Sequence, residues 1–173
     1  MKIRSFVNDE DYTYLEKWVK DERIHALWCA NIIPFPVTKE GLHTALAQGE
    51  LQWGDCACMV TEDNDKPVGF FAYSRVNVLD NSCFLRFVVL DKELRGKGYG
   101  TKMLRFILNH IYCVTGAQSV QLNVFDVNIA ARTCYEKAGF VETSREENAF
   151  SYQGEHWGRC RMKCLRFLSE NVN

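Results

Sequence analysis

A glycine-rich segment in the second half of the chain is the part of the sequence best suited to hold a ligand. An apolar run ends with Val88, Val89 and Leu90, and the segment that follows contains Arg95, Gly96, Lys97, Gly98, Tyr99, Gly100 and Thr101. An amphipathic pattern begins there, so the order predicts a strand, a tight turn and a helix. Glycines let a backbone approach a ligand closely, and the unpaired N–H groups of a helix start attract anions. The sequence therefore predicts a phosphate-binding turn.

The spacing of these glycines excludes two common nucleotide-binding loops. A P-loop needs Gly-x4-Gly-Lys followed by Ser or Thr, which this segment lacks. A dinucleotide-binding loop needs Gly-x-Gly-x-x-Gly after the first strand of a βαβ unit, whereas this chain has Gly-x-Gly-x-Gly after three strands. Short glycine motifs are weak signals, and an ordinary strand-to-helix turn is the alternative.

Two motifs together resemble a known family. The segment Arg95 to Gly100 is similar to the Arg/Gln-x-x-Gly-x-Gly/Ala pyrophosphate loop of the GNAT acetyltransferases. Further along, Asn128, Ala131, Tyr135, Gly139 and Phe140 match the family's second signature, Asn-x-x-Ala-x-x-x-Tyr-x-x-x-Gly-Phe. The resemblance is clearest over residues 68–143. The first residues and two tryptophans are loosely similar to the branch that contains ribosomal-protein and spermidine acetyltransferases.

The resemblance implies a fold and a cofactor site. It predicts one α/β domain over residues 1–173, a GNAT fold with a mixed, mostly antiparallel sheet splayed open at the cofactor and flanked by helices. Acetyl-coenzyme A would be the co-substrate, with no metal. The backbone of Val88, Val89 and Leu90 would pair with the pantetheine arm, and an amide near Val89 would hold the thioester oxygen. Amides from Gly96 to Thr101 would hold the pyrophosphate, and Asn128 would contact the pantetheine besides capping a helix.

The resemblance also implies a catalytic residue. Tyr135 would act as the general acid that protonates the departing thiolate, although it could instead be a core aromatic. Some family members carry a glutamate five residues before the motif's asparagine, but this chain has Asn123, which cannot accept a proton. Glu142, Glu147, Glu155, His156 or water remain as candidates for the general base. Two of these residues, Glu147 and Glu155, fall in a predicted loop over residues 146–157.

Hydrophobic periodicity predicts the elements around these motifs. Strands are expected over residues 3–7, 56–61, 68–78, 83–90, 120–124, 140–143 and 156–164. Helices are expected over residues 9–20 and 24–30, from Thr38, along Met103 to Ile111, and from Asn128 to Ala138. The strand over 83–90 is apolar at nearly every position, which predicts that both of its faces are covered.

Composition and charge exclude several classes of protein. The chain has 173 residues, of which 47% are hydrophobic and 25% charged, with a formal net charge of −1. This balance is typical of a globular protein and argues against a nucleic-acid partner. No stretch of about 18 consecutive apolar residues exists, and the start lacks the pattern of a secretory signal. We therefore expect no membrane partner and a cytoplasmic location.

The eight cysteines favour a reducing compartment. Most lie among core-type residues, including Cys56, Cys58, Cys83, Cys160 and Cys164. A metal site formed by His156, Cys160 and Cys164, with Cys56 and Cys58, is the alternative. Structural zinc usually takes Cys-x2-Cys pairs, which this chain does not have, so core packing is favoured.

The acceptor is expected to be the primary amine of a small molecule or a peptide N-terminus, bound by a homodimeric enzyme. The N-terminal acidic residues Asp9, Glu10, Asp11, Glu16, Asp21 and Glu22 could attract a cationic amine or form a solvated face. Trp18, Trp28 and Trp53 are more typical of core anchors than of ligand platforms. The alternative hypothesis is that the protein is a sensing or scaffold module that binds coenzyme A without turnover. Transfer to oxygen, or of a longer acyl group, stays open.

Overall fold

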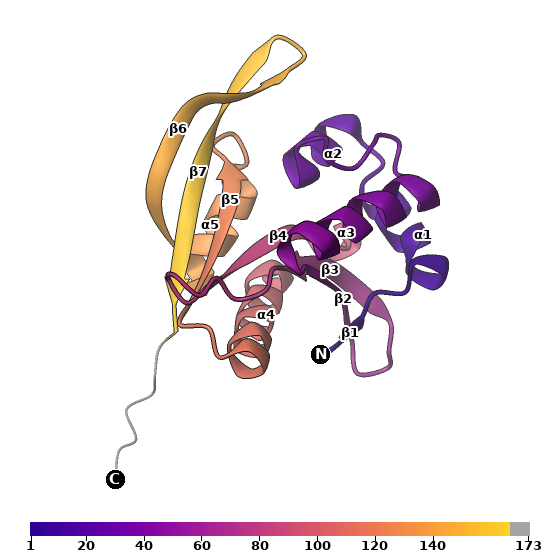
Figure 1. Ribbon diagram of the computed structural model, residues 1–173. Coiled ribbons are helices and arrows are strands. Elements are labelled where there is room, and N and C mark those ends of the chain that lie inside the picture. Colours follow the sequence, from indigo (N-terminus) through magenta and orange to yellow (C-terminus); the bar gives the residue numbers. More distant parts are fainter. Residues whose placement is uncertain (167–173) are drawn as a thin grey trace.

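Seven strands form one mixed sheet at the centre of the protein (Figure 1). The computed structural model describes residues 1–166. The strands are β1 (Lys2–Ser5), β2 (Cys56–Thr61), β3 (Pro67–Tyr73), β4 (Ser82–Leu90), β5 (Ser119–Phe125), β6 (Val141–Tyr152) and β7 (Glu155–Leu165), in the spatial order β1-β2-β3-β4-β5-β7-β6. Every neighbouring pair is antiparallel except β4 and β5, which are parallel. The predicted mixed, mostly antiparallel sheet is confirmed.

Helices cover both faces of this sheet. They are α1 (Asn8–Trp18), α2 (Glu22–Cys29), α3 (Lys39–Trp53), α4 (Tyr99–Thr115) and α5 (Ile129–Ala138), with a short 3-10 helix η1 (Lys92–Leu94). In Figure 1, α1 to α3 lie on one side of β2 to β4, and α4 lies on the other side. None of the helices in the described part of the chain has the length and apolar character needed to cross a bilayer.

Alternation along the strands divides the apolar side chains between two cores. Phe70 of β3 packs in one core with Leu15 and Trp18 of α1, whereas the next residue, Phe71, belongs to the core that contains α4. The predicted apolar stripe of α4 is fully buried in this second core: Met103, Leu104, Ile107, Leu108 and Ile111. Each such side chain stabilises the fold by about 1.5–3 kcal/mol relative to an exposed position.

The long hairpin of β6 and β7 differs from the prediction. The segment 146–157 was expected to be a loop, but β6 runs on to Tyr152 and β7 begins at Glu155. The predicted strand over 140–143 is therefore only its first part, while the predicted strand over 68–78 ends early, at Tyr73. Most of β6 is exposed and has no apolar alternation to reveal it. Pairing with β7 forms this strand, and Phe150 and Trp157 pack beside Ala26 of α2.

A buried carboxylate fixes the start of α1 against β1. Asp11 is 1% exposed and accepts hydrogen bonds from both terminal nitrogens of Arg4, at 2.6 and 2.7 Å, and from the N–H of Val7 at 2.8 Å. This hydrogen bonding raises the pKa of Arg4 above its ordinary value. Asp9, two residues earlier in the same helix turn, is exposed and pairs with Lys39 at 2.9 Å.

We expect Asp11→Asn to lower the free energy of unfolding by about 1–3 kcal/mol, because it leaves Arg4 without its counter-charge. Urea denaturation near neutral pH measures this change. Asp9→Asn is the matched control, and its exposed pair should contribute little that can be measured. Equal losses in the two variants would contradict the assignment of Asp11 as the anchor of α1.

Candidate active site

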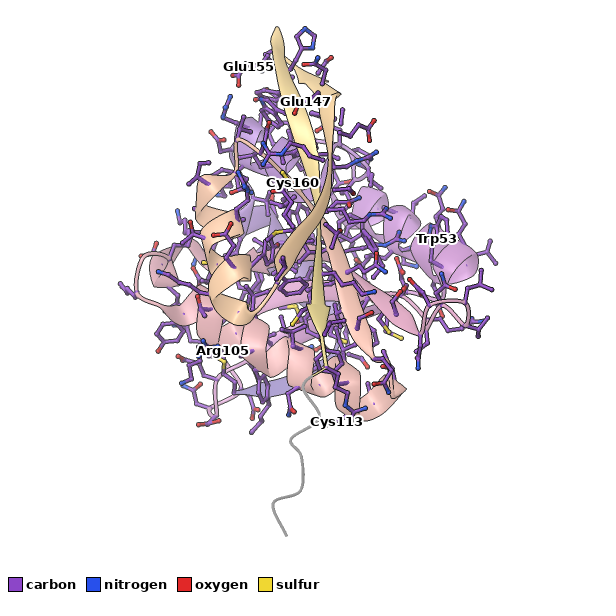
Figure 2. All side chains as sticks on the ribbon, turned by 90° about the vertical axis from the view of Figure 1, so that its left-hand side faces the viewer. Trp53, Arg105, Cys113, Glu147, Glu155 and Cys160 are labelled. Atoms are coloured by element: carbon purple, nitrogen blue, oxygen red, sulfur yellow. The ribbon has the colours of Figure 1, made fainter. Side chains whose placement is uncertain are left out.

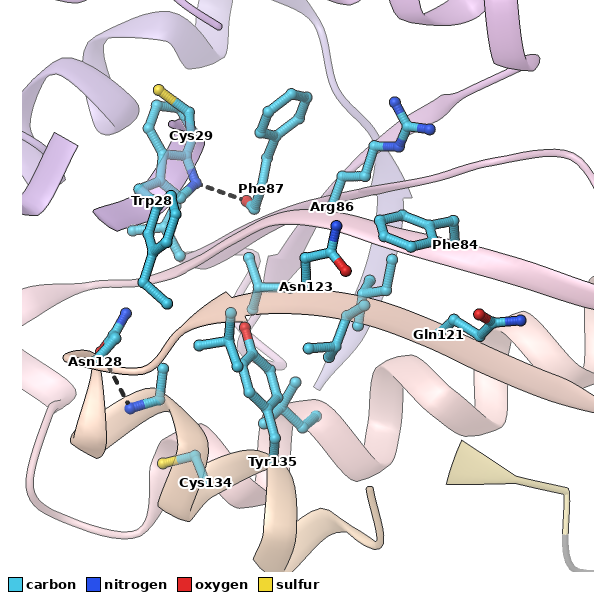
Figure 3. Close-up of a pocket in the computed structure, with 18 of the residues that line it drawn as sticks. Trp28, Cys29, Phe84, Arg86, Phe87, Gln121, Asn123, Asn128, Cys134 and Tyr135 are labelled. Carbon is cyan, nitrogen blue, oxygen red and sulfur yellow. Dashed lines mark hydrogen bonds between the residues drawn. The ribbon is translucent and has the colours of Figure 1, made fainter. Parts of the chain in front are cut away.

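The sheet opens between β4 and β5. These two strands pair only at Ser82–Ser119, Cys83–Val120 and Phe84–Gln121. Beyond that point β4 stays paired with β3 as far as Leu90, and β5 stays paired with β7 as far as Phe125. The facing edges of β4 and β5 therefore part, and a cleft of about 1290 Å3 lies there (Figure 3). The predicted splay of the sheet is present.

A bulge in β4 shapes the edge that faces this cleft. The register with β3 shifts between Phe70 and Ala72, and Phe87 takes a left-handed conformation with φ of 52°. The indole N–H of Trp28 donates a hydrogen bond to the Phe87 carbonyl at 2.8 Å, which ties α2 to the bulge (Figure 3). A β-bulge can re-aim neighbouring groups, so this contact helps to set the direction of the strand edge.

Backbone direction distinguishes the last residues of β4. The N–H of Asp91 donates to the carbonyl of Val68, so Asp91 faces β3. Along an antiparallel strand, the backbone N–H and C=O groups of successive residues point alternately toward and away from the partner strand. The backbone groups of Val89 therefore also point toward β3, and those of Leu90 point toward the gap. The Leu90 carbonyl accepts from the Arg95 side chain, in agreement with this direction.

The glycine-rich turn leaves open space at the start of α4. Gly96 and Gly98 have φ angles of 74° and 79°, a conformation that side chains rarely adopt, and a Cβ at either would meet nothing within 4 Å. Gly98 is the N-cap of α4, whose first N–H groups have no partners within the helix. Gly100 has another role, because a Cβ there would lie 3.2 Å from the sulfur of Cys134.

The two cationic side chains of the turn bind backbone groups. Arg95 donates to the carbonyls of Leu90, at 3.1 and 3.3 Å, and of Trp18, at 3.4 Å. Burial lowers the pKa of Arg95 from its ordinary value, and nearby Asp91 opposes this shift. Lys97 donates to the carbonyl of Glu93 at 2.9 Å. Arg95, Gly96, Gly98, Gly100 and Thr101 line the cleft, whereas Lys97 and Tyr99 are not part of its wall.

The second motif borders the same cleft. Asn128 caps α5, with its side-chain oxygen accepting from the N–H of Ala131 at 3.3 Å, as predicted (Figure 3). Tyr135 lies about two turns after Asn128 on α5, and its hydroxyl points toward β5 in Figure 3. Burial raises the pKa of the Tyr135 hydroxyl well above the ordinary range, and Cys134 adds to this effect. The hydroxyl therefore keeps its proton at neutral pH.

None of the four carboxylate or imidazole candidates for the general base lines the cleft. Glu142 accepts from Arg145 at 3.0 and 3.1 Å and from Arg132 at 3.2 Å, and the Arg145 bond lowers its pKa. Glu155 binds Arg23 and the indole of Trp157, which together lower its pKa to about 2. Glu147 and His156 are exposed on the β6–β7 hairpin, where Figure 2 labels Glu147 and Glu155 near the tip.

Asn123 is exposed on the cleft wall, at the position where some family members carry a glutamate. Two other predictions were wrong. Trp53, expected in the core, is 54% exposed and also lines the cleft. β4 is not covered on both faces, since Phe84 and Arg86 are only partly buried beside the cleft. Alternation within β4 places these two side chains on one face and could have indicated this.

The cysteines are distributed between core and surface. Cys58, Cys83, Cys160 and Cys164 are buried as expected, whereas Cys56 is exposed. Within residues 1–166, no three His, Cys, Asp or Glu side chains come together in a group that could hold a metal ion. His156 lies at the exposed end of β7 and is separated along the strand from Cys160 and Cys164.

Comparison with known proteins identifies the family to which this chain belongs. The family model described as "Acetyltransferase (GNAT) family" matches residues 24–140, which is more than half of the chain and includes both motifs. The chain belongs to the GNAT acetyltransferase family. In the wider set of curated proteins, a probable spermine N(1)-acetyltransferase of Bacillus subtilis subsp. natto is 35% identical over 51 residues. That match covers 30% of this chain and 34% of the relative, so it spans about a third of the relative's length.

Solved structures with the same fold include polyamine acetyltransferases. Spermidine N-acetyltransferase of Vibrio cholerae in complex with CoA and spermine superposes with a TM-score of 0.79 at 18% identity, covering 95% of this chain and 94% of that one. A chimera of the Vibrio cholerae enzyme and hSSAT gives a TM-score of 0.76, also at 18% identity and with the same coverage. At this identity the similarity establishes the fold, and the predicted GNAT architecture is confirmed.

We expect Tyr135→Phe to leave the tyrosinate absorbance of the native protein unchanged between about pH 9 and 10.5, because the buried hydroxyl does not ionise there. A spectroscopic titration of both proteins measures this. In denaturant the phenol is exposed, so the wild type should then show one more ionising tyrosine than the variant. A difference of one tyrosine already in the native titration would contradict the raised pKa.

Proposed function

We propose that this protein is an N-acetyltransferase that uses acetyl-coenzyme A and transfers the acetyl group to a primary amine. The observation that carries the proposal is the coincidence of three features in one cleft. They are the unpaired edges of β4 and β5, the glycine turn that begins α4, and the protonated Tyr135. Family membership and the CoA complex of the Vibrio cholerae enzyme support this choice of donor.

The turn would hold the diphosphate of the donor. Its open space above Gly96 and Gly98 and the first amides of α4 suit an anion. Backbone amides from Gly96 to Thr101 are the proposed ligands. Arg95 and Lys97 bind carbonyl groups and act by fixing the turn, while their charges still favour a phosphate nearby. Tyr99 is proposed to contribute only its backbone amide, because its side chain does not line the cleft.

The strand edge would hold the pantetheine arm. Val88, Val89 and Leu90 are proposed to border it, with Asn128 on the opposite side. The alternation along β4 favours the amides of Val88 and Leu90 over that of Val89 as donors to the arm and to the thioester oxygen. Such a donor would stabilise the negative charge that develops on this oxygen during attack.

The reaction would then proceed by direct transfer. The amine nitrogen attacks the thioester carbonyl carbon, a C–N bond forms and the C–S bond breaks. Tyr135 gives its proton to the sulfur and is reprotonated from solvent. Because Glu142, Glu147, Glu155 and His156 lie outside the cleft wall, we assign removal of the amine proton to water.

A second candidate function is a module that binds coenzyme A without turnover. Asn123 on β5 and the positions of the four base candidates favour it. Release of free thiol from acetyl-coenzyme A in the presence of an amine panel separates the two functions. We further infer a reducing compartment such as the cytoplasm, supported by eight free cysteines, and a homodimer remains a prediction.

Gly98→Glu is expected to weaken binding of coenzyme A by about 100-fold or more, because it brings a carboxylate and bulk into the proposed phosphate site. Isothermal titration measures the affinity. Gly116→Glu is a matched control at the other end of α4, since Gly116 also has a left-handed φ, of 73°, and open surroundings. The control should bind normally, and normal binding by Gly98→Glu would refute the turn as the diphosphate site.

Tyr135→Phe should lower kcat by about 100-fold, with donor affinity changed less than about threefold, because only protonation of the leaving thiolate is lost. Steady-state kinetics and donor titration measure the two effects. Tyr112→Phe is the control, since the partly buried hydroxyl of Tyr112 donates to the Cys164 carbonyl at 2.9 Å, away from the cleft. An unchanged kcat in Tyr135→Phe would remove this residue from the acid role.

A further inference from the structure

The wall of the cleft is strongly positive. A single carboxylate, that of Asp80, lines it in the described part of the chain. The cationic side chains on the same wall are Arg75, Arg86, Arg95, Lys137, Arg159 and Arg161. Arg95 and Lys137 belong to the turn and to α5, on the side assigned to the donor. The other four come from β4, β7 and the segment after β3, so they surround the remaining part of the cleft.

In residues 1–166 the other carboxylates lie outside the cleft wall, and two of them, Asp55 and Glu146, pair with Arg86 and Arg159 of this wall. Both oxygens of Asp80 accept hydrogen bonds, from the Ser82 hydroxyl at 2.7 Å and from the Gln121 amide at 2.8 Å. None of the N-terminal acidic residues expected to attract a cationic amine lines the cleft: Asp9, Glu10, Asp11, Glu16, Asp21 and Glu22. Of the two alternatives considered for these residues, their positions favour a solvated face, while Asp11 fixes α1 and Asp21 caps α2.

Two arginines from opposite sides of the opening meet at Phe84. Phe84 and Arg86 are two residues apart, so their side chains lie on the same face of β4. Arg161 of β7 lies directly opposite Asn123 of β5. The guanidinium carbons of Arg86 and Arg161 lie 5.3 and 5.9 Å from the centre of the Phe84 ring. In Figure 3, Arg86 and Phe84 extend above Asn123 and Gln121, whereas Tyr135 lies below β5.

These two guanidinium groups retain hydrogen-bonding capacity. A terminal nitrogen of Arg86 forms a long ion pair with Asp55, at 3.6 Å, and the Nε of Arg86 has no hydrogen-bond partner in the described structure. Trp53 lies against the same guanidinium, 5.1 Å from its carbon, and helps to fix its plane. Arg161 forms no ion pair with any residue in 1–166, whereas its neighbour Arg159 is paired with Glu146.

We infer that the acceptor is a primary amine that also carries a carboxylate or a phosphate, and that Arg86 and Arg161 bind this anionic group. Guanidinium groups hold both anions through two parallel hydrogen bonds. A polyamine, which has only positive charges, would be repelled by the same wall. The inference rests on the proposed acetyl transfer and specifies its substrate class, which differs from the polyamines named for the relatives.

Matched pairs of amines test this inference. Straight-chain ω-amino acids of increasing length are compared with their carboxamides, and aminoalkyl phosphates with the corresponding amino alcohols, while spermidine and spermine form a third group. We expect kcat/KM for the anionic member to exceed that of its neutral partner by at least about tenfold in one of the two series. The series that shows this preference distinguishes a carboxylate from a phosphate.

Variants connect the preference to the two arginines. Arg161→Gln should reduce the preference for the anionic member to less than about threefold, because kcat/KM falls more for the anionic member than for its neutral partner. Arg86→Gln should act in the same direction, but it also leaves the buried carboxylate of Asp55 without its counter-charge. The exposed Arg161 is therefore the more reliable position for the test. Lys163→Gln is the control, because Lys163 lies two residues along the same face of β7 and does not line the cleft.

Binding of the same amines to the CoA complex, measured by titration, separates failure of this inference from failure of the proposed function. Preferred turnover of polyamines, or equal turnover within each pair, would overturn the anionic acceptor and leave the acetyltransferase intact. Arg161-dependent binding of anionic amines without turnover would support the site and overturn the proposed reaction. Neither binding nor turnover of any anionic amine would overturn the inference.

Discussion

The short parallel pairing of β4 and β5 creates the cleft and positions everything around it. Only three residue pairs join these strands, and each strand then continues beside its other neighbour. The sheet therefore stays continuous while two backbone edges lose their partners. Unpaired backbone groups need a hydrogen-bonding partner, and an extended amide-containing ligand can supply one. The bulge at Phe87, its hydrogen bond from Trp28 and the Arg95 contacts with Leu90 and Trp18 fix one of these edges.

The two ends of the cleft use different physical means to attract charge. At the turn, backbone amides and a helix start act together with Arg95, whose side chain is engaged by carbonyl groups. Around Phe84, arginine side chains provide the charge, and aromatic rings orient one of them. Under the proposed function, one fold keeps the donor site at the turn and changes its acceptor through a few side chains on β4 and β7. Fold similarity to polyamine acetyltransferases is compatible with a different acceptor for this reason.

Much of the fold, including the elements that border the proposed donor site, could be predicted from the sequence, because the signals there are local. Gly98 marks the helix start, Asn128 marks the next cap, and the stripe from Met103 to Ile111 marks a buried face. The full length of the hairpin was missed because β6 exposes most of its side chains and is defined by pairing with β7. The environment of Glu155 depends on Arg23, which is far away in the sequence, and Arg86 meets Arg161 only across the sheet. Such long-range contacts leave no local pattern.

A crystal structure of the protein with coenzyme A would show whether the ligand lies between β4 and β5 and against the glycine turn. We predict electron density for the pantetheine arm between β4 and β5, beside Leu90, and for the diphosphate within hydrogen-bonding distance of the amides of Gly96 to Thr101. Density for the diphosphate at another surface, with the gap between the two strands filled by protein side chains, would contradict the account.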